Sequence, residues 1–147
     1  MHAPVSAAHR LAVALVLLLL VSAAPLVPAA AGAGARTTTI WSDTVVLQDG
    51  YTVESGDVLV VQSGTTIQLG DDETITVDGR LTIQGTTTSP VLLESIMGNH
   101  DGIVFNSTSD GLGSKLENLT ITDAEYGVTV YGSDPILNDL TVINADN

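Results

Sequence analysis

The sequence predicts an all-β protein, a right-handed parallel β-helix (β-solenoid) of about four to five coils preceded by an N-terminal signal helix. Three observations lead to this prediction: an apolar leader, a body of short β-branched runs between turn residues, and a repeat whose period lies in the low twenties. Together they favour a stack of strand–turn coils placed behind a secretion signal.

The segment 1–35 has the pattern of a secretory signal peptide. After a polar start, Leu11–Val21 forms an uninterrupted apolar run. The small residues that follow offer candidate cleavage sites after Ala31 and after Ala35. This run is short for a membrane-spanning helix, which needs roughly 20 apolar residues. We expect residues 1–35 to be removed and the rest to be secreted or displayed at the cell surface. Membrane contact is expected only through an uncleaved signal.

The exported remainder is strongly acidic. All seventeen Asp and Glu residues follow Arg36, against three basic side chains, so this part carries a net charge of −14. Nucleic-acid binding needs clustered Lys and Arg, and the composition therefore excludes it. An acidic surface attracts divalent cations or tolerates high salt. The chain has no cysteine, which excludes disulfides and thiolate metal sites.

The body of the chain consists of strand-sized runs. Residues 36–43 are expected to form a short linker and residues 44–147 the β-helix repeats. The runs alternate apolar and polar residues, and Gly, Asp, Ser or Asn separates them, so they favour strands over helices. The clearest runs are Val58–Val61, Ile67–Leu69, Ile75–Val77, Leu81–Ile83 and Val91–Leu93.

Repetition is the decisive feature of this body. Leu116–Ala124 and Leu137–Ala145 align without a gap, and Gly102–Phe105 matches Gly127–Val130. A period in the low twenties with several short strands is typical of a solenoid. Two looser matches place Val58 and Val60 opposite Leu81 and Ile83, and Ile67 and Leu69 opposite Val91 and Leu93.

The alternation gives the repeat a physical meaning. Residues i and i+2 share one face of a strand, so Leu119 and Ile121 point inward together. Leu140 and Val142 then take the same inward places one coil later, about 4.8 Å along the axis. An antiparallel β-sandwich also has short, regularly spaced strands, but it does not explain why whole coils realign. A last coil needs cover, so we expect the natural protein to continue beyond Asn147.

The segment from Tyr51 to Asn147 carries a family resemblance. Its opening coils read YTVESGDVLVVQSGTTIQL, ITVDGRLTIQGT and SPVLLES, and its repeats read GSKLENLTITDAEYGVTVYGSDPILNDLTVINADN. This series resembles the right-handed parallel β-helix repeat proteins (PbH1 repeats) of the pectin-lyase-like superfamily. The resemblance implies a secreted or surface protein that either cleaves acidic polysaccharides or serves as a binding or structural stalk.

The residues do not make a complete active site. Lyases of this superfamily use clustered aspartates for Ca²⁺ and an Arg or Lys base, whereas Arg80 and Lys115 are expected to lie exposed, and His100 in a surface loop. Two carboxylates about 5–10 Å apart can hydrolyse glycosides, and Asp123 and Asp139 are candidates. Each has an Asn at the matching position one repeat away, which stacked turns explain more simply. We therefore assign no catalytic residue.

Weaker signals concern metal binding and glycosylation. Carboxylates clustered on a turn can supply oxygen ligands to Ca²⁺, although the spacing fits no EF-hand loop; no other cofactor is expected. N-glycosylation sequons begin at Asn106 and Asn118. The calcium candidates are Asp71, Asp72, Glu73 and Asp78.

The leading functional prediction is a secreted or cell-surface β-helix module with a structural or binding role toward polysaccharide or the cell envelope. Rows of Thr, Asn and Asp on flat sheets suit sugar hydroxyls. The alternative is the N-terminal part of a polysaccharide lyase or glycoside hydrolase whose catalytic coils lie downstream.

Overall fold

A computed structural model describes residues 36–110 and 113–143. The signal helix and its cleavage sites, expected within residues 1–35, lie outside the described residues. Within the described part, no helix has the length and apolar character needed to cross a membrane.

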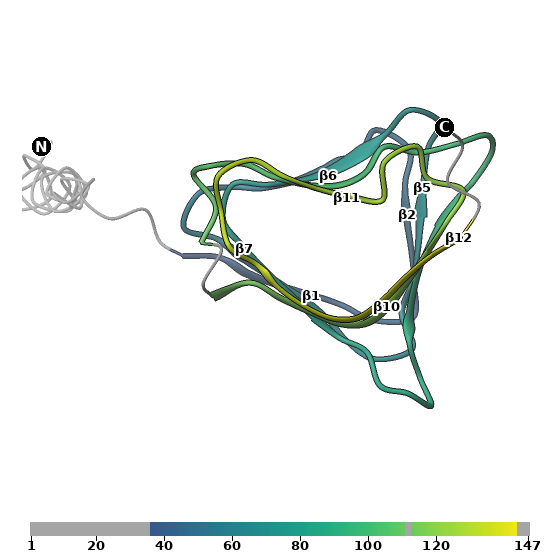
Figure 1. Ribbon diagram of the computed structural model, residues 1–147, viewed down its shortest axis with the longest axis horizontal. Coiled ribbons are helices and arrows are strands. Elements are labelled where there is room, and N and C mark those ends of the chain that lie inside the picture. The colour runs from purple at the N-terminus through teal and green to yellow at the C-terminus, as the bar shows by residue number, and fades with distance from the viewer. Residues whose placement is uncertain (1–35, 111–112, 144–147) are drawn as a thin grey trace, which may run out of the picture. The chain divides into compact units, whose positions relative to one another are not determined.

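The described chain is a parallel β-solenoid of about four turns with three walls (Figure 1). Each pairing between its named strands is parallel. Wall A consists of β1 (Thr38–Trp41), β4 (Val58–Val61), β7 (Arg80–Gln84) and the first half of β10 (Lys115–Thr122). Wall B consists of β2 (Thr44–Leu47), β5 (Thr66–Leu69), β8 (Val91–Ser95) and the second half of β10. Wall C consists of β3 (Tyr51–Val53), β6 (Thr74–Val77), β9 (Gly102–Phe105) and β11 (Val128–Val130). The last strand, β12 (Ile136–Ile143), pairs with β10 along walls A and B.

The solenoid begins earlier than the sequence suggested. Strand β1 lies within residues 36–43, the expected linker, and pairs in parallel with β4. Its pattern was hard to recognise because two of its four residues are Thr and its buried residue is a single Trp, Trp41.

The long repeats have the register predicted for them. Leu119 pairs with Leu140 on wall B, as the gapless alignment of the two repeats requires. Ile103 pairs with Val128 on wall C, as the match of Gly102–Phe105 with Gly127–Val130 requires. The β-solenoid is therefore confirmed at the two places where the sequence alignment was clearest.

The first of the two looser matches was wrong by one residue. Leu81 pairs with Leu59 rather than with Val58, so Leu59 and Val61 are the inward residues of β4. The run Val58–Val61 is apolar throughout, so it offers no alternation from which to choose a face.

The second looser match fails for a different reason. Ile67 pairs with Leu93 rather than with Val91. A small loop, closed by an antiparallel bridge between Thr86 and Ser89, adds residues at the corner between β7 and β8. The buried Thr65, rather than Ile67, therefore lies beside the start of β8, where its carbonyl accepts the amide of Leu92 at 3.0 Å.

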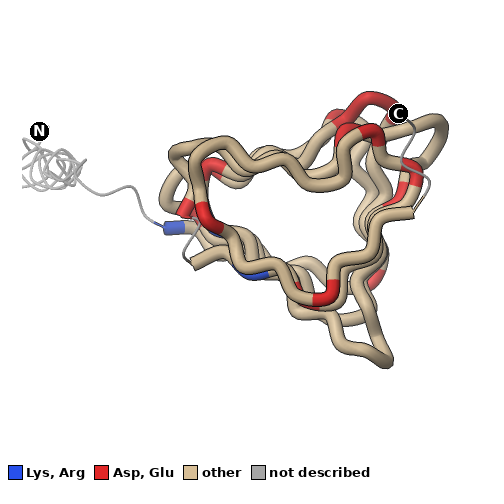
Figure 2. Tube along the Cα trace, viewed as in Figure 1, with Lys and Arg blue, Asp and Glu red and all other residues tan. Residues whose placement is uncertain are grey.

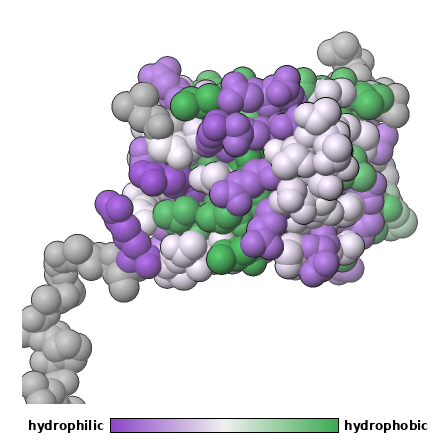
Figure 3. Space-filling model, turned by 90° about the horizontal axis from the view of Figure 1, so that it is seen from below, coloured by the Kyte–Doolittle hydropathy of each residue, from purple (hydrophilic) through white to green (hydrophobic). Residues whose placement is uncertain are grey.

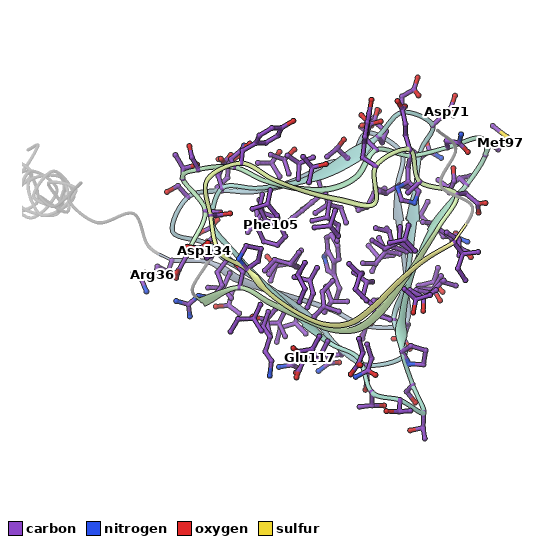
Figure 4. The ribbon with its side chains drawn as sticks, viewed as in Figure 1. Arg36, Asp71, Met97, Phe105, Glu117 and Asp134 are labelled. Carbon is purple, nitrogen blue, oxygen red and sulfur yellow. The ribbon has the colours of Figure 1, made fainter. Side chains whose placement is uncertain are left out.

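The core is a set of inward columns that run along the axis. One column contains a residue from each of the strands along wall A, in the order Trp41, Val61, Ile83, Leu116 and Leu137. Phe105, which is fully buried, points into the interior from wall C (Figure 4). At the first coil the Trp41 and Tyr51 rings pack edge to face, with centroids 4.8 Å apart.

Exposure along one column shows how each coil depends on the next. Leu116 is 0% exposed beneath β12, whereas Leu137, its equivalent in β12, is 42% exposed. Ile121 and Val142 differ in the same way, at 0% and 42%. The apolar residues of a coil are therefore buried by the neighbouring coil rather than by their own.

Corners between walls use backbone conformations that favour Asn, Asp or Gly. Asn118 and Asp139 occupy the same bend one coil apart, with φ of 46° and 53°, as their alignment predicted. At Gly102, where φ is 83°, an added Cβ would lie 2.0 Å from the carbonyl oxygen of Gly127. Only glycine meets both requirements there.

Replacing an inward residue should cost far more stability than replacing its outward neighbour. Leu119 is 1% exposed between Val91 and Leu140, so Leu119→Ala should lower the free energy of unfolding by about 2–5 kcal/mol. Thr120→Ala, one position along the same strand, should change it by no more than about 0.5 kcal/mol. Urea denaturation of both variants measures the difference, and equal losses would contradict the inward assignment.

Candidate functional site

A small open pocket lies at the corner where wall C turns into wall A. Its volume is about 270 Å³. That is just below the roughly 300–1,000 Å³ of pockets that take drug-sized ligands, so it suits a small polar molecule. Three successive coils contribute to this corner pocket, which is lined by Arg36, Ser55–Val58, Asp78–Arg80, Thr108 and Asp110.

Backbone hydrogen bonds between coils fix the walls of the corner pocket. The amide of Arg80 donates to the carbonyl of Asp57 at 2.9 Å, and the amide of Asp110 donates to the carbonyl of Gly79 at 2.9 Å. An added Cβ at Gly79 would lie 2.2 Å from the carbonyl oxygen of Glu54 and 2.5 Å from that of Asp57. Glycine at this position therefore lets the two coils approach closely under the pocket.

Asp57 is held at one side of the corner pocket. Its Oδ1 accepts the backbone amide of Thr37 at 2.8 Å, and the carbonyl of Thr37 in turn accepts the amide of Val58 at 2.9 Å. The side chain is half-buried. Among residues 36–110 and 113–143, no hydrogen bond engages its second carboxylate oxygen.

Asp78 is held by side chains of the next coil. Its Oδ1 accepts Oγ1 of Thr108 at 2.7 Å and Nδ2 of Asn106 at 3.0 Å. These two hydrogen bonds, that of Thr108 first, hold the pKa of Asp78 below its usual value. The side chain is therefore ionised at neutral pH, and its Oδ2 has no hydrogen bond within the described part of the chain.

The two arginines of the corner pocket have different surroundings. Nε of Arg80 donates to Oδ2 of Asp110 at 3.0 Å, and its terminal nitrogen forms an ion pair with the same oxygen. The hydrogen bond from Arg80 is the main cause that lowers the pKa of Asp110. Arg36 is exposed and forms no ion pair with any described residue. Its guanidinium is thus the available cation of this pocket.

Charge elsewhere on the solenoid is mainly negative and gathers at its corners (Figure 2). Lys115, the remaining described cation, pairs with Glu117 at 2.6 Å on the outer face of wall A. That wall mixes hydrophilic and hydrophobic side chains without one large apolar face (Figure 3). Two of the three described basic residues therefore meet in the corner pocket.

The calcium candidates do not converge on a single site. Asp71, Asp72 and Glu73 lie in the turn between β5 and β6, whereas Asp78 follows β6 at its other end. The length of β6 separates them by about 13 Å. Oδ1 of Asp71 accepts the backbone amide of Asn99 at 3.2 Å. Within the described residues, no group of three or more His, Asp or Glu side chains is placed to hold a metal ion. Figure 4 shows Asp71 and Arg36 at different corners.

The two sequon asparagines are already engaged in the folded chain. Asn106 donates to Asp78, and Nδ2 of Asn118 donates to the carbonyl of Gly85 at 3.2 Å. Attachment of a glycan to either amide would have to replace or rearrange these hydrogen bonds. Glycosylation of Asn106 and Asn118 stays a prediction from the sequence.

His100 is not in an exposed loop, so that expectation was wrong. It is 0% exposed and forms a parallel bridge with Ala124 of the next coil. Its Nε2 lies 3.0 Å from the carbonyl oxygen of Thr122, and its Nδ1 is buried without a hydrogen-bond partner among the described residues. This environment suits the neutral imidazole. Burial lowers the pKa of His100, although the Thr122 carbonyl and two nearby aspartates, Asp123 and Asp101, act in the opposite direction.

The carboxylates considered for hydrolysis lie at bends. Asp123 has φ of 58° at the corner after β10, and its carbonyl accepts the amide of His100 at 3.0 Å. Asp139 occupies the bend inside β12. Both positions are explained by the local backbone, which favours Asn and Asp in left-handed conformations.

The sequence did not reveal the corner pocket, although it contained one usable signal. Its charged residues extend from Arg36 to Asp110, and they meet only because successive coils stack. The signal was the placement of the few basic residues. Arg36 comes just before β1, and Arg80 is the first residue of β7; both strands belong to wall A.

Comparisons of the chain with protein-family models, with curated proteins and with solved structures found no match.

His100 should make the fold less stable in mild acid. The unfolded chain takes up a proton near pH 6.5, while the folded chain resists it because its His100 pKa is lower. The free energy of unfolding should therefore fall as the pH drops below about 6.5, by at most about 1.4 kcal/mol per pH unit from this group.

The variant His100→Leu removes that proton uptake. Urea denaturation at pH 7.5 and 5.5 should show a smaller loss of stability on acidification for His100→Leu than for the unmodified protein. Equal losses would show that the neutral, buried state of His100 does not contribute.

Proposed function

We propose that the chain is a secreted or cell-surface module, a right-handed parallel β-helix of the pectin-lyase-like type, that binds polysaccharide of the surroundings or the cell envelope. The observation that carries this proposal is the corner pocket, where charged and hydroxyl side chains of three coils converge on a rigid corner.

The right-handed sense is part of the proposal and has a physical basis. Connections between parallel strands of one sheet are right-handed in about 98% of cases, because the strand twist favours that path. The successive strands of each wall are joined by connections that run through the other two walls, which is the kind of connection to which this preference applies.

The export part of the proposal rests on the leader. Its apolar run and small-residue exits fit a secretory signal, and the acidic, cysteine-free remainder does not depend on a redox environment for folding. A charge of −14 on this remainder, from three basic and seventeen acidic side chains, also disfavours nucleic acid as a partner.

The binding part of the proposal rests on chemistry. Sugars present many hydroxyl donors, and ionised carboxylates accept such hydrogen bonds more strongly than neutral groups do. The corner pocket offers three carboxylates, two hydroxyl side chains and two guanidinium groups within one small volume. Hydrogen bonds within the fold already hold the three carboxylates, which lowers the ordering cost of binding.

Polysaccharide binding can be tested with the full chain, expressed with its leader and recovered from outside the cell. Purified protein should be depleted from solution by at least one insoluble polymer in a panel of cellulose, chitin, cross-linked pectin and peptidoglycan. Binding should persist at high salt, because hydroxyl contacts are less screened than long-range attraction between charges.

The same samples separate binding from catalysis. Release of unsaturated uronates or of reducing ends from the soluble forms of these polymers would favour the enzyme alternative. Protein that stays inside the cell, or binds none of the polysaccharides, would contradict the proposal.

A further inference from the structure

We propose that the corner pocket is a subsite for one ring of a neutral, hydroxyl-rich saccharide, whose neighbouring hydroxyls donate to Asp57 and Asp78. This inference rests on the proposed polysaccharide-binding function and specifies the ligand class and the residues that recognise it.

The pocket has two carboxylates that are each only partly used within the fold. Asp57 and Asp78 each use Oδ1 within the fold, to Thr37 and to the pair Asn106 and Thr108. Both residues line the pocket, and within the described residues no hydrogen bond engages the second oxygen of either carboxylate. Because both carboxylates are already held by hydrogen bonds, little side-chain freedom is lost when a ligand binds.

The charge of the pocket decides which saccharide fits. Asp110 and Arg80 satisfy each other, so the remaining charged groups are Arg36 and the two carboxylates of Asp57 and Asp78. One cation against two anions, on a strongly acidic solenoid, disfavours a uronate. A neutral ring avoids this repulsion and still supplies donors to the carboxylates, while Arg36 can donate to a ring or hydroxyl oxygen.

The shape of the pocket sets the size of the ligand. Its volume of about 270 Å³ and its open mouth accommodate a single ring while the rest of a polymer continues along the surface. At Gly56, an added Cβ would meet no atom within 4 Å, so the rim is free of side chains there. Gly79 lets the backbones of two coils approach closely under the pocket.

The test is calorimetric titration of the full chain with neutral gluco-, manno- and galacto-oligosaccharides and with oligogalacturonate. At least one neutral oligosaccharide should bind more tightly than the uronate. Asp57→Asn and Asp78→Asn should each weaken that binding about tenfold or more, because each removes a charged acceptor. Asp49→Asn, which removes an exposed charge at another corner of the first coil, should leave the affinity unchanged.

A second measurement uses the unmodified protein, so it does not depend on whether the variants fold. Amide NMR spectra of the isotope-labelled protein, titrated with the same neutral oligosaccharide, should change mainly at Gly56, Asp57 and Gly79. Changes confined to other residues would overturn the assignment of this pocket, and so would tighter binding of oligogalacturonate.

Different results would contradict the pocket assignment and the proposed polysaccharide binding. Retention on polysaccharide that Asp57→Asn and Asp78→Asn do not affect would overturn the pocket assignment and leave the binding module intact. Absence of binding to every polysaccharide and oligosaccharide would overturn both.

Discussion

The structure depends on one constraint, the stacking of apolar side chains from successive coils in inward columns. No coil has enough residues to enclose its own core. Leu116 and Ile121 are fully buried because β12 covers them, and their equivalents in β12 are about two-fifths exposed. Each coil therefore contributes half of an apolar contact, and stability grows with the number of neighbouring pairs. The first coil is a partial exception to this dependence on neighbouring coils, because its Trp41 and Tyr51 rings pack against each other.

The same constraint leaves the corners as the variable part of the fold. Walls must keep their inward residues in register, whereas corners need only a bend that the backbone can adopt. Asn118, Asp139 and Gly102 make such bends without disturbing the columns. The loop closed by Thr86 and Ser89 adds residues at a corner, and yet β7 still pairs with β4 and β8 with β5. A site that requires irregular polar residues is therefore placed most easily at a corner, as in the corner pocket.

The sequence predicted the solenoid but only part of its register. Where polar and apolar residues alternate, as in the β10 and β12 repeats, one shift alone places the apolar residues inward, and the pairing of Leu119 with Leu140 followed. The apolar run of β4 permits two shifts, and the observed pairing differs by one residue from the predicted one. His100 was misplaced because one polar residue between turns gives no periodicity. The corner pocket could not be predicted, since its residues meet only once the register of three coils is known.

The arrangement of charge distinguishes this corner from the other acidic corners and supports the proposed recognition of a ligand there. Carboxylates on an exposed turn are solvated and mobile, and water competes with any ligand for them. At the corner pocket, Thr37 and Thr108 each fix one oxygen of a carboxylate, and the Arg80 pair with Asp110 removes one charge of each sign from the balance. What remains is a small set of oriented acceptors beside one guanidinium. Under the proposed function, such a set distinguishes a neutral donor-rich ring from a polyanion, because repulsion acts on the polyanion alone.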